Sequence, residues 1–211
     1  MGITIKAYIM KKCLVTGLIM WLCSFAAIAQ NKVPPVDQST MDMSYFPANY
    51  PILKIQDKIN EPLIARTVYS RPTANGRTVF GELVEYDKVW RIGANEATEV
   101  EFYQNVVIGG KQVPKGRYTL YAIPNLQQWT MILNSELDTW GSFKYDSKKD
   151  IVRVNVPVKQ LNEPVDPFSI YFEKTPDGFA LVAAWENFMV TLPVKLNSTP
   201  VKAAAKPVKK K

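Results

Sequence analysis

Residues 98–123 read TEVEFYQNVVIGGKQVPKGRYTLYAI, and this stretch decides the fold class. Val100 and Phe102 fall on one face of an extended chain while glutamates fall on the other, which is the period-two pattern of a half-buried strand. Gly109-Gly110 separates two further short apolar runs and is a signal for a two-residue hairpin turn. The stretch therefore predicts consecutive antiparallel strands.

Short apolar runs separated by turn signals continue on both sides of this stretch. We expect strands at residues 63–69, 98–103, 106–108, 111–113, 117–123, 129–134, 152–158, 168–172, 179–186 and 188–194. A sheet that is apolar on one face must bury that face. The sequence therefore predicts an all-β protein, with a single antiparallel β-sandwich or jelly-roll-like domain over residues 61–196.

The first 29 residues have the pattern of a signal peptide. Lysines at positions 6, 11 and 12 precede an apolar run over residues 14–25, and Ala27-Ile28-Ala29 supplies the small residues that a signal peptidase recognises. The apolar run is shorter than the roughly 20 residues of a membrane span. We expect cleavage near Ala29, export to the periplasm or the outside of the cell, and no transmembrane segment in the mature chain.

The segments that flank the predicted domain differ in composition. Residues 30–60 are rich in proline, which argues against a helix, and predict an extended N-terminal arm. Because Met43, Tyr45 and Phe46 are too apolar for a free linker, we expect the arm to pack on the domain; a disordered lead-in is the alternative. Residues 197–211 are rich in lysine and cannot bury apolar surface, so they predict a disordered tail.

Two absences limit the chemistry of the mature chain. Both cysteines, Cys13 and Cys23, lie in the predicted signal peptide, and the sequence contains no histidine. Disulfides, a cysteine nucleophile, Ser-His-Asp catalysis and imidazole-bound metals are therefore excluded. We predict no catalytic residue, no metal site and no cofactor, and carboxylates are the main acid–base groups that remain.

The positive net charge belongs to the ends of the chain. The sequence has 26 lysines and arginines against 19 acidic residues, a formal net charge of +7. Three of these lysines lie in the predicted signal peptide and five follow Thr199, which leaves 18 basic against 19 acidic side chains in residues 30–199. Because the domain itself is close to neutral, we expect no nucleic-acid binding by it.

Residues 69–98, YSRPTANGRTVFGELVEYDKVWRIGANEAT, concentrate polar and aromatic side chains. Guanidinium groups suit carboxylates, phosphates and sugar hydroxyls, and a Trp ring offers an apolar platform beside them. We therefore expect a binding site for a carbohydrate or a small anionic ligand derived from the cell envelope. The candidate residues are Arg71, Arg77, Trp90, Arg91, Asn95, Glu96 and Thr98.

Two other interpretations of this segment stay open. In the first, its role is purely structural or in interaction: Arg91 pairs with Glu96, Asn95 bonds to the loop backbone, and Trp90 anchors the core. In the second, the protein is a carboxylate-dependent hydrolase of the envelope. Glu96 would then act with Glu82, Glu99 or Asp138, as two carboxylates do in glycoside hydrolysis. The sequence favours binding over catalysis, because no spacing places two carboxylates across a bond.

The pattern SRP…GR..FG.LV.Y..VWR.GANEAT, residues 70–98, resembles a large family of secreted bacterial proteins. That family is known only as a domain of unknown function, number twenty-nine eleven, and is typical of the Bacteroidota. The resemblance extends over approximately residues 41–194 and is most specific at residues 90–98. It implies an exported protein of uncharacterised activity, and it assigns no catalytic residues.

Overall fold

The computed structural model describes residues 33–196, and residues 37–196 belong to one compact unit. The regular secondary structure of the described part is almost wholly β-strand. Its elements are β1 (Met41–Phe46), α2 (Tyr50–Ile55), β2 (Ala65–Ser70), β3 (Glu99–Phe102), β4 (Val106–Ile108), β5 (Lys111–Val113), β6 (Gly116–Ile123), β7 (Gln128–Asn134), a 3-10 turn at Ser147–Lys149, β8 (Asp150–Thr175) and β9 (Gly178–Leu196). The predicted signal peptide and the predicted lysine-rich tail lie outside the described residues.

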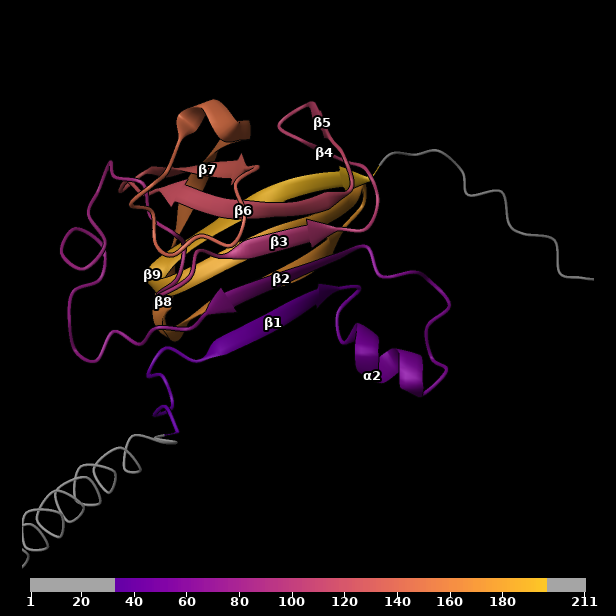
Figure 1. Ribbon diagram of the computed structural model, residues 1–211, viewed down its shortest axis with the longest axis horizontal. Coiled ribbons are helices and arrows are strands. Elements are labelled where there is room, and N and C mark those ends of the chain that lie inside the picture. Colours follow the sequence, from indigo (N-terminus) through magenta and orange to yellow (C-terminus); the bar gives the residue numbers. More distant parts are fainter. Residues whose placement is uncertain (1–32, 197–211) are drawn as a thin grey trace, which may run out of the picture. The chain divides into compact units, whose positions relative to one another are not determined.

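The strands of the described residues form one antiparallel sheet in the order β1-β2-β3-β6-β7-β8-β9-β4-β5. Strand β8 connects two parts of this sheet, because its residues 150–157 pair with β7 and its residues 158–175 pair with β9. In Figure 1 the β8–β9 hairpin lies behind the layer formed by β1, β2, β3, β6 and β7. Ser44 of β1 donates from Oγ to the carbonyl oxygen of Ile170 in β8 at 2.6 Å, so the sheet curls back on itself. The prediction of an all-β antiparallel fold is confirmed.

The hairpin of β4 and β5 forms where the sequence predicts it. Gly109 and Gly110 both have positive φ, of 57° and 80°, which a tight two-residue hairpin turn of this type requires. A Cβ atom at Gly109 would lie 2.6 Å from the side chain of Val154, so a larger residue does not fit there. The hairpin pairs through β4 with the end of β9.

An aromatic cluster fills the core where the two parts of the sheet face each other. The ring of Trp90 lies 5.8 Å from that of Trp129 in β7, 5.3 Å from that of Phe168 in β8 and 6.1 Å from that of Trp185 in β9, measured between ring centroids. All four residues are buried. Aromatic side chains each bury a large apolar area, so this cluster joins the segment that contains Trp90 firmly to the sheet.

The N-terminal arm differs from the prediction in one respect. Residues 41–46 are extended, as β1, and pair with β2. Residues 50–55, however, form the short helix α2, although the prolines of the arm argue against a helix. Pro51 stands at the start of the helix, where its missing N–H has no intrahelical partner in any case and its fixed φ suits the helix.

Strands β8 and β9 are longer than the sequence predicts. The apolar alternation divides each into two short strands, whereas each is continuous in the structure. The β8–β9 pairing contains register shifts between Gln160 and Val165 and between Val165 and Ser169, and Glu186 opposite them has a φ of 48°. Such bulges invert the facing of the side chains that follow, so the alternation breaks although the strand continues.

Candidate functional site

The segment between β2 and β3, residues 71–98, contains the predicted site and is bonded to the sheet along its length. Trp90 and Ala122 of β6 exchange two backbone hydrogen bonds, with N–O distances of 2.7 and 2.9 Å. The N–H of Thr98 donates to the carbonyl oxygen of Arg91 at 3.1 Å, and Thr98 Oγ1 donates to that of Ile92 at 2.7 Å. Because Thr98 is fully buried, its hydroxyl holds this turn and does not contact a ligand.

The turn that follows Arg91 has a strained backbone. Ile92 has a φ of 53°, a conformation that a β-branched residue rarely adopts. Trp90 Nε1 donates to the carbonyl oxygen of Gly93 at 3.1 Å, and together with the bonds of Thr98 it clamps the turn. Strain of this kind persists only where the surroundings over-determine the conformation, and it is frequent at functional sites. Here it fixes the direction in which Arg91 leaves the backbone.

Arg71, which directly follows β2, bonds to β1 and to β8. Its Nη1 donates to Asp42 Oδ2 in β1 at 3.0 Å, its Nη2 donates to Ser169 Oγ in β8 at 2.8 Å, and its Nε donates to the carbonyl oxygen of Phe168 at 3.2 Å. Every nitrogen of the guanidinium group therefore has an acceptor within the protein. Arg71 is placed to stabilise the contact between β1 and β8.

Trp90 is a core residue and not an exposed platform. Its side chain is 8% exposed, and its ring is enclosed by the aromatic cluster of the core. Trp90 lies in the core, as the structural interpretation of this segment predicts. A sugar ring cannot stack on a ring whose faces are already covered by other aromatic side chains.

Within residues 71–98, Arg91 is the residue with a buried polar side-chain atom that has no partner. Its Nε is buried and has no acceptor, and the side chain forms no ion pair or hydrogen bond with any residue in the described range. Burial lowers the pKa of the Arg91 guanidinium from its ordinary value, and no carboxylate offsets that effect. Ser70 Oγ and Trp129 Nε1 are also buried without a partner in residues 33–196, but Arg91 is the charged member of this group.

Arg91 lines a cavity of about 210 Å³ together with Arg77. Arg77 Nε donates to the carbonyl oxygen of Ala74 at 2.8 Å and its Nη2 donates to that of Thr73 at 2.9 Å, so this guanidinium is held in place by its own loop. None of the lining residues is acidic. They are Ser39, Pro72, Arg77, Leu83, Val84, Trp90, Arg91, Gly93, Ala94 and Trp185.

The remaining candidates lie elsewhere. The carbonyl oxygen of Asn95 accepts from the N–H of Gly141 at 2.9 Å, and the backbone of Asn95 has a φ of 57°. Glu96 is exposed and lines a different cavity, of about 280 Å³, with Glu99 and Asp138. The Arg91–Glu96 pair of the structural interpretation is therefore not formed. The structure brings Arg77, Trp90 and Arg91 together and separates them from Glu96.

The carboxylates proposed for hydrolysis are partly gathered by the fold. Glu99 and Asp138 share the cavity of Glu96, whereas Glu82 is not among its lining residues. Arg117 Nη2, however, donates to Glu99 Oε2 at 2.7 Å and to Asp138 Oδ1 at 2.8 Å. These bonds occupy oxygen atoms of both carboxylates, so those oxygens are not free to contact a substrate. Within residues 33–196 there is no group of three or more acidic, Cys or His side chains suited to a metal ion.

Three aromatic residues that border cavities, Trp140, Phe143 and Trp185, are not among the predicted site residues. Trp185 lines the Arg91 cavity, but its place in an alternating strand indicates only a core residue. Trp140 and Phe143 border a larger cavity and are 62% and 83% exposed. The sequence does contain a signal for Trp140 and Phe143. They lie on either side of Gly141 and outside every predicted strand, so the packing of a sheet face does not explain two aromatic residues there.

Comparison with known proteins adds the family. Residues 51–194 match the model of a family described as a protein of unknown function (DUF2911). The chain belongs to this family. No curated protein matches the chain, and no solved structure matches it. In the DUF2911 chain, no helix within residues 33–196 has the length and apolar character needed to cross a membrane.

Proposed function

We propose that the protein binds a small anionic ligand in the Arg91 cavity and does not catalyse a reaction there. The observation that carries this proposal is the unpaired Arg91 guanidinium, with a buried Nε that lacks an acceptor. A buried polar group without a partner is costly, and a charged one more so. A ligand with a carboxylate, phosphate or sulfate group would supply the missing acceptors in the planar arrangement that a guanidinium prefers.

The shape and charge of the cavity support an anion over a neutral sugar. Two guanidinium groups and no carboxylate line it, and its volume of about 210 Å³ is below the usual range of about 300–1,000 Å³ for drug-sized ligands. Trp90 is covered by other rings and offers no free face. The ligand is therefore a small molecule recognised chiefly through its charge.

The location of this function is part of the proposal. The sequence pattern of residues 1–29 supports export, and a ligand derived from the cell envelope fits a periplasmic or extracellular protein. The resemblance to secreted proteins of the Bacteroidota supports the same compartment. The curled antiparallel sheet, interpreted as a β-sandwich, would serve as a rigid scaffold for the cavity.

A second candidate function is hydrolysis by the carboxylate cavity. The presence of Glu96, Glu99 and Asp138 around one cavity favours it. The bonds of Arg117 to two of these three carboxylates weigh against it, because they leave Glu96 as the one acid of the group without that partner. Turnover of a chromogenic glycoside that is lost in Glu96→Gln would support hydrolysis over binding.

The binding proposal is tested by calorimetric titration of the protein with phosphate, sulfate and a panel of small mono- and dicarboxylic acids. We expect at least one anion to bind, and its affinity to fall at least tenfold in Arg91→Met, since a hydrogen bond to a charged group contributes about 1.5–3 kcal/mol. Arg66→Met is the matched control, because Arg66 pairs with Glu101 outside the cavity. The proposal is wrong if no anion binds, or if Arg91→Met binds as tightly as the wild type.

A further inference from the structure

The largest of the three cavities, of about 570 Å³, is formed mainly by the segment between β7 and β8. Residues 135–149 make up this segment, and Tyr121 of β6 forms part of the wall. The volume lies within the usual range for small-molecule sites. None of the residues of the Arg91 cavity lines it, so the two hollows are separate.

Two aromatic side chains at this cavity are exposed to solvent. Trp140 is 62% exposed and Phe143 is 83% exposed. Single exposed apolar residues are ordinary, but two aromatic rings beside one concave surface are not. Gly141 lies between them with a φ of 68°, and a Cβ atom there would lie 2.6 Å from the Phe143 ring. The glycine therefore allows the Phe143 ring to lie directly against the backbone.

The backbone that carries these rings is held in place by hydrogen bonds. Ala97 N–H donates to the carbonyl oxygen of Thr139 at 3.0 Å, on one side of Trp140, and Gly141 N–H donates to that of Asn95 at 2.9 Å, on the other. Ser142 Oγ donates to the carbonyl oxygen of Val89 at 2.9 Å. These bonds hold the backbone that carries the two rings. The aromatic surface is pre-organised, which reduces the entropic cost of binding.

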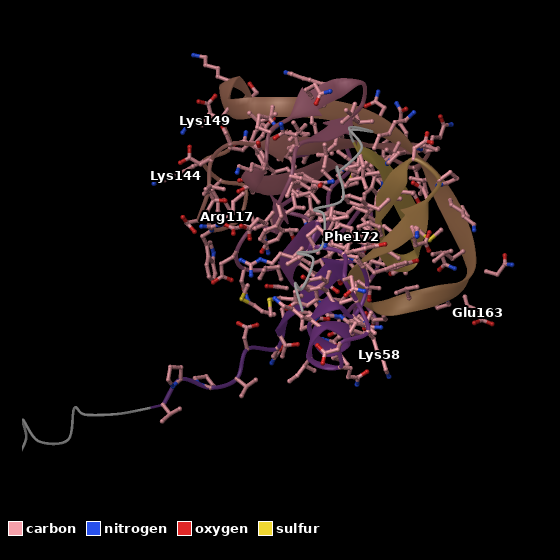
Figure 2. The ribbon with its side chains drawn as sticks, turned by 90° about the vertical axis from the view of Figure 1, so that its right-hand side faces the viewer. Lys58, Arg117, Lys144, Lys149, Glu163 and Phe172 are labelled. Atoms are coloured by element: carbon pink, nitrogen blue, oxygen red, sulfur yellow. The ribbon has the colours of Figure 1, made fainter. Side chains whose placement is uncertain are left out.

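The charges around the cavity largely cancel. Glu136 forms an ion pair with Lys149, and Asp138 forms one with Arg117. Figure 2 shows Arg117, Lys144 and Lys149 on the same side of the view, which is the side of this cavity. Paired carboxylates and cations keep donors and acceptors at the rim without a strong net field. This differs from the Arg91 cavity, where the lining charges are all positive.

We propose that this cavity is a saccharide-binding site and that its occupant is a neutral oligosaccharide. A sugar ring presents apolar C–H faces, which pack on the rings of Trp140 and Phe143, and hydroxyl edges, which bond to charged and hydroxyl groups such as Glu136 and Thr139. A protein partner is disfavoured, since a stable interface buries about 800 Å² on each side. Here the exposed apolar surface is confined to two rings at the edge of a hollow.

The test is an array of neutral and acidic oligosaccharides, followed by titration of the best neutral one while tryptophan fluorescence is recorded. We expect binding by the wild type, with a change in emission, and at least a tenfold weaker affinity for Trp140→Ala and for Phe143→Ala. Tyr171→Ala is the matched control, because Tyr171 is 37% exposed on β8 and does not line the cavity. Circular dichroism and the melting temperature establish that each variant is folded.

The anion-binding proposal and the saccharide-binding proposal can be refuted independently of each other. Arg91→Met leaves saccharide affinity unchanged, and Trp140→Ala leaves anion affinity unchanged, if the sites are independent. The saccharide proposal is overturned if no neutral oligosaccharide binds, or if the double variant Trp140→Ala, Phe143→Ala binds as the wild type does. It is also overturned if sedimentation shows a wild-type dimer that Trp140→Ala dissociates while no saccharide binds, because the rings then form an interface between two copies.

Discussion

Two tryptophans in two loops of this protein differ in burial: one ring is buried and the other is exposed. Trp90 and Trp140 each stand outside the main strands, and each forms a backbone bridge to another part of the chain, Trp90 with Ala122 and Trp140 with Glu96. Trp90 is 8% exposed, whereas Trp140 is 62% exposed. Docking of the backbone therefore does not decide the position of the ring. What differs is the surroundings: the ring of Trp90 is enclosed by rings from β7, β8 and β9, whereas the ring of Trp140 lies at the edge of the 570 Å³ hollow.

Truncating the two rings gives the largest expected difference. Trp90→Ala removes a buried indole from the aromatic cluster and leaves a cavity, so we expect it to lower the free energy of unfolding by about 3–5 kcal/mol. Trp140→Ala removes an exposed ring and should change that free energy by less than about 0.5 kcal/mol. Urea unfolding of both variants measures the difference. Equal losses would mean that the ring of Trp140 is buried in solution.

A smaller contrast concerns the hydroxyl groups that hold the two loops. Thr98→Val keeps the shape of a fully buried side chain but removes the bond to the carbonyl oxygen of Ile92, so a loss of about 1–3 kcal/mol is expected. Ser142→Ala removes a bond to the carbonyl oxygen of Val89 at a partly exposed position, where water can replace it. We expect that loss to stay below about 1 kcal/mol, again by urea unfolding. The reverse order would contradict the burial that distinguishes the loops.

The sequence predicted those strands whose two faces differ clearly. In β3 the apolar residues Val100 and Phe102 are buried and the intervening glutamates are not, and the β4–β5 hairpin is signalled by its glycines. Strand β1 escaped prediction as a strand because most of its residues, including Met41 and Met43, are at least partly exposed on both faces. The bulge at Glu186 hid the continuity of β9. Local alternation predicts faces, and it fails where an edge or a bulge removes the difference between them.

The candidate site was harder to predict, because its pairing depends on turns that have no periodic signal. Nearness in sequence suggested that Arg91 would meet Glu96. Ile92 and Asn95 between them both have positive φ, of 53° and 57°, and the chain turns so that the two side chains line different cavities. Positive φ at a β-branched residue is not readable from sequence, since the surrounding packing imposes it. The residue types of the site were predictable, but the partners were not.

The smallest expected difference in stability is between variants of two arginines of the same loop, Arg91→Met and Arg71→Met. Arg91→Met removes an unpaired, partly buried charge and keeps most of the apolar stem, so the free energy of unfolding should change by less than about 0.5 kcal/mol or rise. Arg71→Met removes three hydrogen bonds that join β1, β2 and β8, and should cost about 1–2 kcal/mol at this partly exposed position. Thermal unfolding without added anions, followed by unfolding in phosphate, compares the two variants.

The phosphate series makes this comparison decisive for Arg91. A residue kept for stability loses stability when it is replaced, with or without a ligand, whereas a residue kept for binding loses only the stabilisation that the ligand adds. We therefore expect the melting temperature of Arg71→Met to be lower in both buffers and still to rise when an anion binds. Arg91→Met should match the wild type without anion and should not respond to it. A large loss for Arg91→Met in the absence of anions would instead assign Arg91 to the framework of the loop, with a partner that forms in solution.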